Sequence, residues 1–228
     1  MVGSLDLARL PLGPAQREVL RASRRGFAAG SLFARQLLAI RLQSVPFPLP
    51  QMTTVIYLAL WEDEASIARF RESSLRPWLA SGQHLSLTLA PLQSFGSWRG
   101  EDPLGGYRSE SDPTRPTLLL THSATRARSA PAFLIADRPV VRSLPKAPGH
   151  LWAGGFLDRV RSLDTGTLSL WSSTEDALGF AYSDGEHQRA VKAQREGRWF
   201  GESWFARFNV TDADGRWGDL DVQSLKPS

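Results

Sequence analysis

Residues 54–64 read TVIYLALWEDE, and this stretch decides the fold because residues 165–176 repeat its pattern as TGTLSLWSSTED. In both stretches, a run rich in β-branched, aromatic or alternating apolar residues ends on a tryptophan, Trp61 or Trp171. Such runs predict β-strands. The acidic residues that follow predict helix starts, because negative side chains stabilise the positive end of a helix dipole. The sequence therefore predicts the same strand–helix unit twice.

The similarity extends in both directions along the chain. Short matches keep their order along the chain and agree on two offsets. An offset of 110 residues aligns 59–61 with 169–171 and Phe70 with Phe180. An offset of 119 residues aligns 31–34 with 150–153 and 96–98 with 215–217. This agreement favours an internal duplication over coincidence.

Each half also has a predicted closing strand with alternating apolar residues. The alternating sets are Leu85, Leu87 and Leu89 in the first half and Trp204, Ala206, Phe208 and Val210 in the second. Residues 16–39 and 130–142 are expected to supply the first helix of each half. Two strand–helix–strand units per half form the ferredoxin-like plan. We therefore predict an α+β fold in which two tandem ferredoxin-like repeats pack as an α+β barrel. A single irregular α+β domain is the alternative.

The stretch between the halves, residues 99–116, reads RGEDPLGGYRSESDPTRP. Its glycine, proline, serine and charged residues predict a linker. The expected organisation is a first repeat over residues 1–98, this linker, and a second repeat over residues 117–228. Each half then has the size of one small domain.

The composition excludes several classes of protein. The 228 residues contain no cysteine, which removes disulfides, zinc–thiolate sites, iron–sulfur clusters and thiol nucleophiles. A net charge of +4 is weak for this length, and no nucleic-acid partner is expected. Prolines at 46, 48 and 50 interrupt the uncharged stretch 43–61, so it does not predict a membrane span. Without a signal peptide pattern, a cytoplasmic protein is expected, and peripheral membrane contact stays compatible with the sequence.

The two halves differ by nine residues between Phe180 and the closing strand. The extra segment, residues 183–197, predicts a helix with a capping box and a glycine stop. His187, Ala190 and Val191 share one face of this helix, with Arg189 and Lys192 on its flank. Small side chains beside an imidazole leave room for a large flat group. A haem whose iron is bound by His187, with its propionates near the basic flank, fits this pattern.

The alternative interpretation of His187 is a hydrogen-bonded core histidine, and the basic flank is then a solvated face. Trp199 and Phe200 follow the helix and are either walls of a pocket or plain core. The other histidines show no two-histidine metal motif. The pairs Gly105–Gly106 and Gly154–Gly155 are interpreted as turns, and hydrolase and nucleotide-binding motifs are missing from the sequence.

One region resembles a known family. Phe180-Ala181-Tyr182, Gly185-x-His187, Ala190-Val191-x-Ala193-x-Arg195 and Trp199-Phe200-x-Glu202-x-x-x-Ala206-Arg207-Phe208 are similar to the C-terminal signature of the spheroidene monooxygenases, acyclic carotenoid 2-ketolases of the dimeric α+β barrel type. The stretch 48–61 is similar to the family's N-terminal strand. The glycine-rich stretch expected before that strand is missing, because residues 38–43 read LAIRLQ. This departure puts the carotenoid substrate in doubt more than the fold.

The resemblance implies a haem b-dependent monooxygenase that uses dioxygen, an external electron donor and an extended apolar substrate of the carotenoid or terpenoid type. It implies His187 as the iron ligand, Phe180, Trp199 and Phe200 as flanks of the pocket, and Glu202 and Arg207 as supports. Barrels of this type imply a homo-oligomer by analogy. A haem-dependent lyase or dehydratase, a haem-binding module without turnover and a cofactor-free barrel are the alternatives.

Overall fold

A computed structural model describes residues 1–14, 17, 28–42, 49–80, 83–110, 112–158, 164–182 and 199–226. Its long strands close into one barrel in the order β1-β3-β2-β6-β7-β5-β8-β4, and all neighbouring pairs are antiparallel. The strands are β1 (Val2–Arg9), β2 (Phe33–Arg41), β3 (Leu49–Trp61), β4 (His84–Gly96), β5 (Thr117–Thr125), β6 (His150–Leu157), β7 (Asp164–Trp171) and β8 (Phe200–Arg216).

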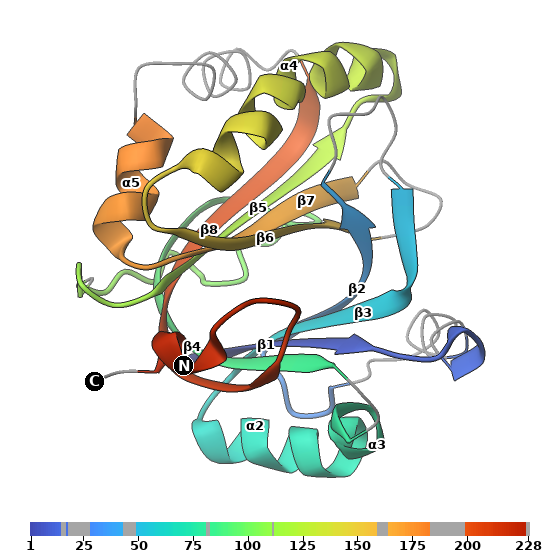
Figure 1. Cartoon of the computed structure of the whole chain (residues 1–228), viewed down its shortest axis with the longest axis vertical. Helices are drawn as coiled ribbons and strands as arrows, with labels where there is room; N and C mark the ends of the chain where they lie inside the picture. Colours follow the sequence, from blue (N-terminus) through green and yellow to red (C-terminus); the bar gives the residue numbers. More distant parts are fainter. Residues whose placement is uncertain are drawn as a thin grey trace.

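The barrel consists of two equivalent four-stranded parts, which we call the first half-sheet (β1–β4) and the second half-sheet (β5–β8). Their spatial orders are β4-β1-β3-β2 and β8-β5-β7-β6, the ferredoxin-like order in both cases. Contacts between β4 and β8 and between β2 and β6 close the barrel (Figure 1). The predicted α+β barrel of two tandem ferredoxin-like repeats is confirmed.

Strand register reproduces both offsets of the internal repeat. Phe33 pairs with Leu60 between β2 and β3, and Trp152 pairs with Leu170 between β6 and β7. The two closing strands are also followed by equivalent bridges, one between Trp98 and Glu101 and one between Trp217 and Leu220. The repeat therefore reaches the level of individual residue pairs.

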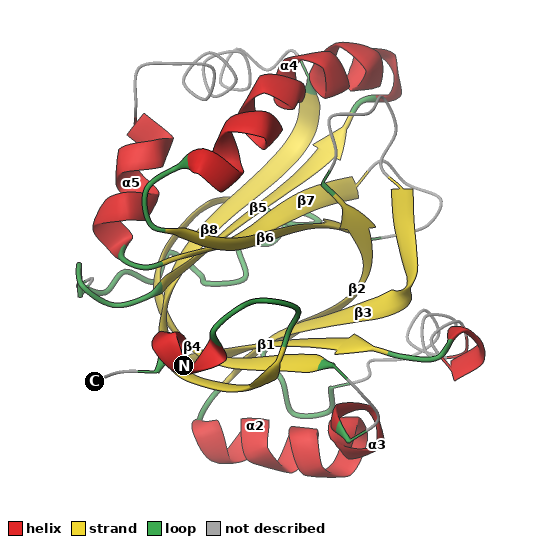
Figure 2. Cartoon of the chain, viewed as in Figure 1, coloured by secondary structure: helices red, strands yellow, loops and turns green. Residues whose placement is uncertain are grey.

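Helices cover the outside of each half-sheet (Figure 2). Below the first half-sheet lie α2 (Glu64–Phe70), a π-helical turn (Arg71–Leu75) and α3 (Arg76–Leu79), and above the second lie α4 (Ala130–Ser143) and α5 (Thr174–Tyr182). The helix starts after Trp61 and Trp171 are confirmed. Asp63 caps α2 by accepting from the Ser66 backbone N–H, and at the equivalent end of α5 the residue types are exchanged, with the Ser173 hydroxyl donating to Asp176.

The core has an inner and an outer part. Alternate residues of the strands fill the barrel, including the predicted inward sets of both closing strands. The outer part lies between sheet and helix: Val55, Tyr57, Trp61, Ile67 and Phe70 belong to it in the first half, and Leu119, Trp171 and Ala177 in the second. Sheet alternation explains why both faces of each strand are used.

Several sequence-based expectations were wrong. Residues 33–39, expected within a helix, form β2, in which the consecutive residues 37–40 are all buried, so both faces of the strand are covered there. Gly154 and Gly155 lie inside β6, where a Cβ on Gly155 would come within 2.7 Å of the Ile40 side chain. The glycine pair therefore permits the close approach of β2 and is not a turn.

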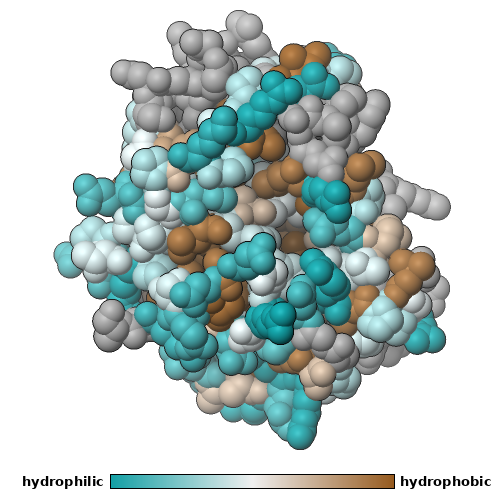
Figure 3. All heavy atoms as spheres, in the orientation of Figure 1, coloured by the Kyte–Doolittle hydropathy of each residue, from teal (hydrophilic) through white to brown (hydrophobic). Residues whose placement is uncertain are grey.

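The surface in the orientation of Figure 3 shows hydrophobic residues in separate patches between hydrophilic ones. Among the described helices, none is both long and apolar enough to cross a membrane. Within the stretch 99–116, Leu104 is 3% exposed and belongs to the barrel core, while Gly105 and Gly106 have positive φ angles in the predicted turn.

Candidate functional site

The outer face of the second half-sheet carries small hydroxyl side chains where the first carries larger or apolar ones. Leu118 and Leu120 of β5 and Leu168 and Leu170 of β7 point into the barrel, so the residues that alternate with them, Leu119 included, point outward. These outward residues are Thr121, Ser123, Thr165, Thr167 and Ser169, and their equivalents in the first half-sheet are Asp6, Ala8, Val55, Tyr57 and Ala59. In the first half-sheet all five of these residues are buried. In the second, the three threonines are only partly buried. The largest decrease in size is at Tyr57, where the second half-sheet has Thr167, while at Ser4 the exchange runs the other way, because Leu119 stands there.

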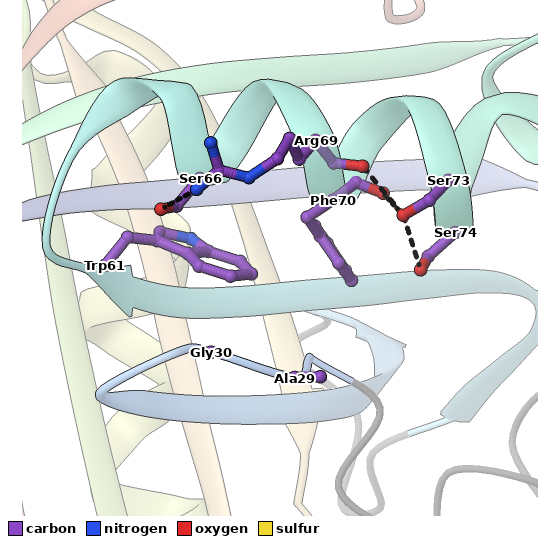
Figure 4. Close-up of a pocket in the computed structure, with 8 residues that line it drawn as sticks. All are labelled: Ala29, Gly30, Trp61, Ser66, Arg69, Phe70, Ser73 and Ser74. Carbon is purple, nitrogen blue, oxygen red and sulfur yellow. Dashed lines mark hydrogen bonds between the residues drawn. The ribbon is translucent and has the colours of Figure 1, made fainter.

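One aromatic contact is the same in both halves. Phe70 of α2 lies 5.1 Å from the Trp61 ring, and Phe180 of α5 lies 5.1 Å from the Trp171 ring. In the first half, Trp61 and Phe70 line a pocket of about 340 Å³ next to Ala29, with Arg69 at its edge (Figure 4). Phe180 therefore lies on the outer face of the second half-sheet and has a packing role with a counterpart in the other half.

A second aromatic group lies at the opposite end of this face. Phe133 of α4 contacts Phe200 at 5.0 Å and Trp199 at 6.1 Å between ring centroids. Phe200 pairs with Thr125 at one end of β5, whereas Trp171 pairs with Thr117 at the other. The hydroxyl side chains therefore lie between two aromatic groups, one at each end of the strands.

Arg207 lies on the same outer face, opposite Leu119 across the β5–β8 pair. Its Nε is buried and has no hydrogen-bond partner among the described residues. Burial lowers the pKa of Arg207, and the nearby Tyr182 of α5 acts in the other direction. A guanidinium stays protonated even so, so this face holds a partly desolvated positive charge.

The first half balances its buried charge internally. Arg71 donates from Nε to Asp6 Oδ1 at 2.7 Å and from Nη2 to the Leu87 carbonyl at 2.9 Å, and Asp6 is 1% exposed. By the strand register, Thr121 stands where the first half has Asp6. By the 110-residue offset, Ala181 stands where it has Arg71.

The equivalent of Arg207 is Thr88, which Arg71 contacts at 3.4 Å. The second half has thus lost the internal ion pair and gained a cation on the sheet. An anionic group bound at this face would supply the missing countercharge.

Glu202, which the family resemblance implies as a support, accepts hydrogen bonds from the turn that follows β4. Its carboxylate accepts from the Ser97 hydroxyl at 2.6 Å, the Gly100 N–H at 2.6 Å and the Arg99 N–H at 3.0 Å. Burial tends to raise the pKa of Glu202, but these hydrogen bonds hold it below its usual value. Arg99 has a positive φ of 59°, and Glu202 helps to hold this unusual backbone in place. The structure thus gives Glu202 a positioning role at the barrel end.

The remaining residues of the expected haem site, His187, Arg189, Lys192, Ala190 and Val191, lie outside the described residues. The described structure brings Phe180, Trp199, Phe200 and Arg207 to one face of one half-sheet.

The sequence-based search missed Phe133 of α4, which gives no motif. It also missed a cluster at the barrel end formed by His122, Asp158 and Asp164. One sequence pattern could have indicated His122: it continues the alternation of Leu118 and Leu120, and this places its side chain inside the barrel.

Comparisons with known proteins agree with the fold and with the resemblance to the spheroidene monooxygenases. No family model matches the chain. A spheroidene monooxygenase of Rhodobacter capsulatus is 29% identical over 65% of this chain and 62% of its own length. One from Cereibacter sphaeroides is 26% identical over 76% of this chain and 54% of its own length. The chain therefore spans less than two thirds of these relatives. The crystal structure of an aldoxime dehydratase superposes with a TM-score of 0.60 at 12% identity, covering 100% of this chain and 87% of its own, which supports the shared fold.

Proposed function

We propose that this protein is a haem-dependent monooxygenase that oxidises an extended apolar substrate of the carotenoid or terpenoid type with dioxygen. Its similarity to two spheroidene monooxygenases supports the reaction class. The observation that carries the haem assignment is the asymmetry between the two half-sheets. The first has Val55, Tyr57 and an internal Arg71–Asp6 pair, and the second has Thr165, Thr167 and an Arg207 whose Nε has no hydrogen-bond partner among the described residues.

The described residues fit a haem. A porphyrin needs an apolar slot with a cation near its carboxylates, and the second half-sheet supplies aromatic residues at both ends of its outer face and the orphaned Nε of Arg207. His187, in the segment between α5 and β8, would supply the nitrogen ligand to the iron. Arg189 and Lys192 would lie near the propionates together with Arg207. Bound there, haem would supply the activation of dioxygen, which no side chain of this chain can provide.

The chain's own residues bind, orient and exclude water. Phe180 on Trp171 closes one end of the face, and Phe133 with Trp199 and Phe200 closes the other. With haem bound, these buried and partly buried rings would help to exclude water and so strengthen electrostatic interactions inside the site. Arg207 would pair with a haem carboxylate and thereby fix the orientation of the ring in its plane.

The overall reaction balances with an external two-electron donor. Substrate R–H, dioxygen, two electrons and two protons give R–OH and one water. A second round at the same carbon gives a geminal diol, which loses water to form a ketone. Since the chain has no cysteine and no dinucleotide fingerprint, the electrons are expected from a separate donor protein or small reductant.

The first experiment is the absorption spectrum of the purified protein, reconstituted with haem if necessary. We expect a Soret band that the His187→Ala variant loses and that the matched His150→Asn variant keeps. We also expect Arg207→Met to weaken haem binding about tenfold, the effect of a partly buried charge pair. The matched control is Arg108→Met, whose guanidinium lies over the Phe95 ring instead. A wild type that takes up no haem would overturn the proposal.

The second experiment tests turnover. Haem-loaded protein is incubated with a reductant, dioxygen and a linear carotene, and the products are analysed by mass spectrometry. A ketone product has gained one oxygen and lost two hydrogens. Haem uptake without oxidation of any apolar substrate would refute the monooxygenase proposal and favour a binding module.

A further inference from the structure

A histidine inside the barrel has an environment that the proposed function does not use. His122 lies on β5 but points to the opposite side from the face with Arg207, in line with the core residues Leu118 and Leu120. Its ring stacks on Trp98 with a centroid distance of 4.3 Å and an interplanar angle of 10°. The residue is 1% exposed, so bulk water does not satisfy its nitrogens.

Neither ring nitrogen of His122 has a hydrogen-bond partner among the described residues. One nitrogen nevertheless lies in a group with a carboxylate oxygen of Asp158 and one of Asp164, all within 4.8 Å of one another. Leaving a buried polar group unsatisfied costs about 1–3 kcal/mol. Carboxylates that are close to the imidazole but do not hydrogen-bond to it therefore indicate an atom between them.

The fold holds these three ligand atoms in place. Asp158 follows β6 and Asp164 begins β7, and the Asp158 N–H donates to the Asp164 carbonyl at 2.9 Å. The Asp158 side chain is 2% exposed, and its Oδ2 accepts from Trp98 Nε1 at 3.0 Å and from Arg99 Nη2 at 2.6 Å. Trp98 thus stacks on the imidazole and orients the carboxylate, as outer-shell partners of metal ligands do.

A glycine makes room for this stack. Phe156 also stacks on the Trp98 indole, with ring centroids 5.7 Å apart and an interplanar angle of 16°. A Cβ on Gly166 would lie 2.2 Å from Phe156 Cζ. The glycine therefore lets Phe156 support Trp98, and through it His122, in one orientation.

We propose that His122, Asp158 and Asp164 bind a divalent transition-metal cation such as zinc. Imidazole nitrogens and carboxylate oxygens are both zinc ligands, and three protein ligands leave the fourth position of a tetrahedral site open for water. Three carboxylates, those of Asp158, Asp164 and Glu202, act electrostatically on His122, against one guanidinium, that of Arg99. This surplus of negative charge favours a cation over a lone water. The proposal does not depend on haem, because the cluster is on the other face of β5.

The test uses the full chain after treatment with a chelator, in the His187→Ala background so that haem iron is not counted. Zinc is added, and its binding is followed by calorimetry and by elemental analysis. We expect one zinc per chain and, at a hundredfold excess over Kd, a rise of roughly 5–10 °C in Tm. Cobalt added instead of zinc should give visible d–d absorption bands.

Two variants remove ligands while keeping shape. His122→Phe retains a ring that can stack on Trp98, and Asp164→Asn is isosteric. Each should weaken zinc binding at least tenfold, while His150→Asn, which removes a partly buried histidine outside the cluster, should bind zinc like the parent. The proposal is overturned if zinc binding is not saturable. A water molecule between the three side chains would then be the better explanation. It is also overturned if both ligand variants bind zinc as tightly as the control.

Discussion

The ion pair between Arg71 and Asp6 gives a quantitative test of the asymmetry on which the proposed function rests. The perturbations are Arg71→Met, which removes the cation, and Asp6→Asn, which keeps the size of the acid but removes its charge. Asp6 has a side-chain exposure of 1% and Arg71 one of 20%. The two changes should therefore differ in cost, because only the guanidinium has access to solvent.

The expected magnitudes follow from what each variant leaves behind. Arg71→Met leaves an isolated carboxylate in the outer core, and removing one partner of a buried pair costs about 3–5 kcal/mol. Asp6→Asn leaves a guanidinium that still donates to the Leu87 carbonyl at 2.9 Å, so a loss of about 1–3 kcal/mol is expected. The double variant Asp6→Leu/Arg71→Met should recover to within about 1 kcal/mol of the wild type, since it leaves no buried charge.

The pH dependence of the free energy of unfolding gives a second, independent test. Burial raises the pKa of Asp6, and Arg71 counteracts that rise. Without Arg71 the pKa of Asp6 in the folded chain rises further above its unfolded value. The folded state then binds a proton more tightly than the unfolded state, so the free energy of unfolding increases as pH falls through the folded pKa. The deficit of Arg71→Met should therefore be largest at pH 7 and shrink toward pH 4.5.

The assay is urea unfolding at several pH values, with m compared between variants. Arg69→Met is the matched control, because Arg69 is exposed on α2 and donates to the Ser66 hydroxyl, and it should change stability by less than about 0.5 kcal/mol. Equal losses for Arg71→Met and Asp6→Asn, or a deficit of Arg71→Met that does not vary with pH, would refute the reasoning.

Three further changes test other parts of the structure. Phe70→Leu and Phe180→Leu should each lower the free energy of unfolding by about 1–2 kcal/mol in urea, but only Phe180→Leu should alter haem titration. Gly166→Ala should lower stability by about 1–3 kcal/mol or more, because the added methyl overlaps Phe156, and unchanged urea unfolding would contradict this. Burial lowers the pKa of His150, so the unfolded chain binds more protons below about pH 6.5 and the wild type loses stability as pH falls. His150→Asn should flatten that dependence, and unfolding curves recorded between pH 5 and 7.5 would show it.

The fold could be predicted from the sequence because its signals are local and repeated. The alternation in the closing strands and the capping residues after Trp61 and Trp171 each act within one turn or one strand. The strand β2 could not be assigned in this way. Because both of its faces are buried, residues 33–39 lack the polar alternation that distinguishes a strand from a helix.

The candidate site was predicted only in part because the barrel brings together residues that are far apart in the sequence. Phe180, Trp199 and Phe200 are close in sequence, and their shared face follows from one strand and one helix. Phe133 reaches them from α4, and no sequence spacing encodes that contact. The cluster of His122, Asp158 and Asp164 depends likewise on strand register, which pairs Ala124 with Asp164 across β5 and β7.

A duplicated fold explains why one half is a candidate for chemistry and the other is not. Two copies of one unit begin with the same packing requirement, and both retain the contact of a phenylalanine on a strand-end tryptophan. The first copy pairs its buried charges with each other, Arg71 with Asp6. The second copy carries Arg207, whose buried Nε has no hydrogen-bond partner in the described part of the chain, and hydroxyl residues in place of Val55 and Tyr57. Because desolvating a cation costs free energy unless an anion accompanies it, the second face gains more from binding an anionic cofactor than the first would.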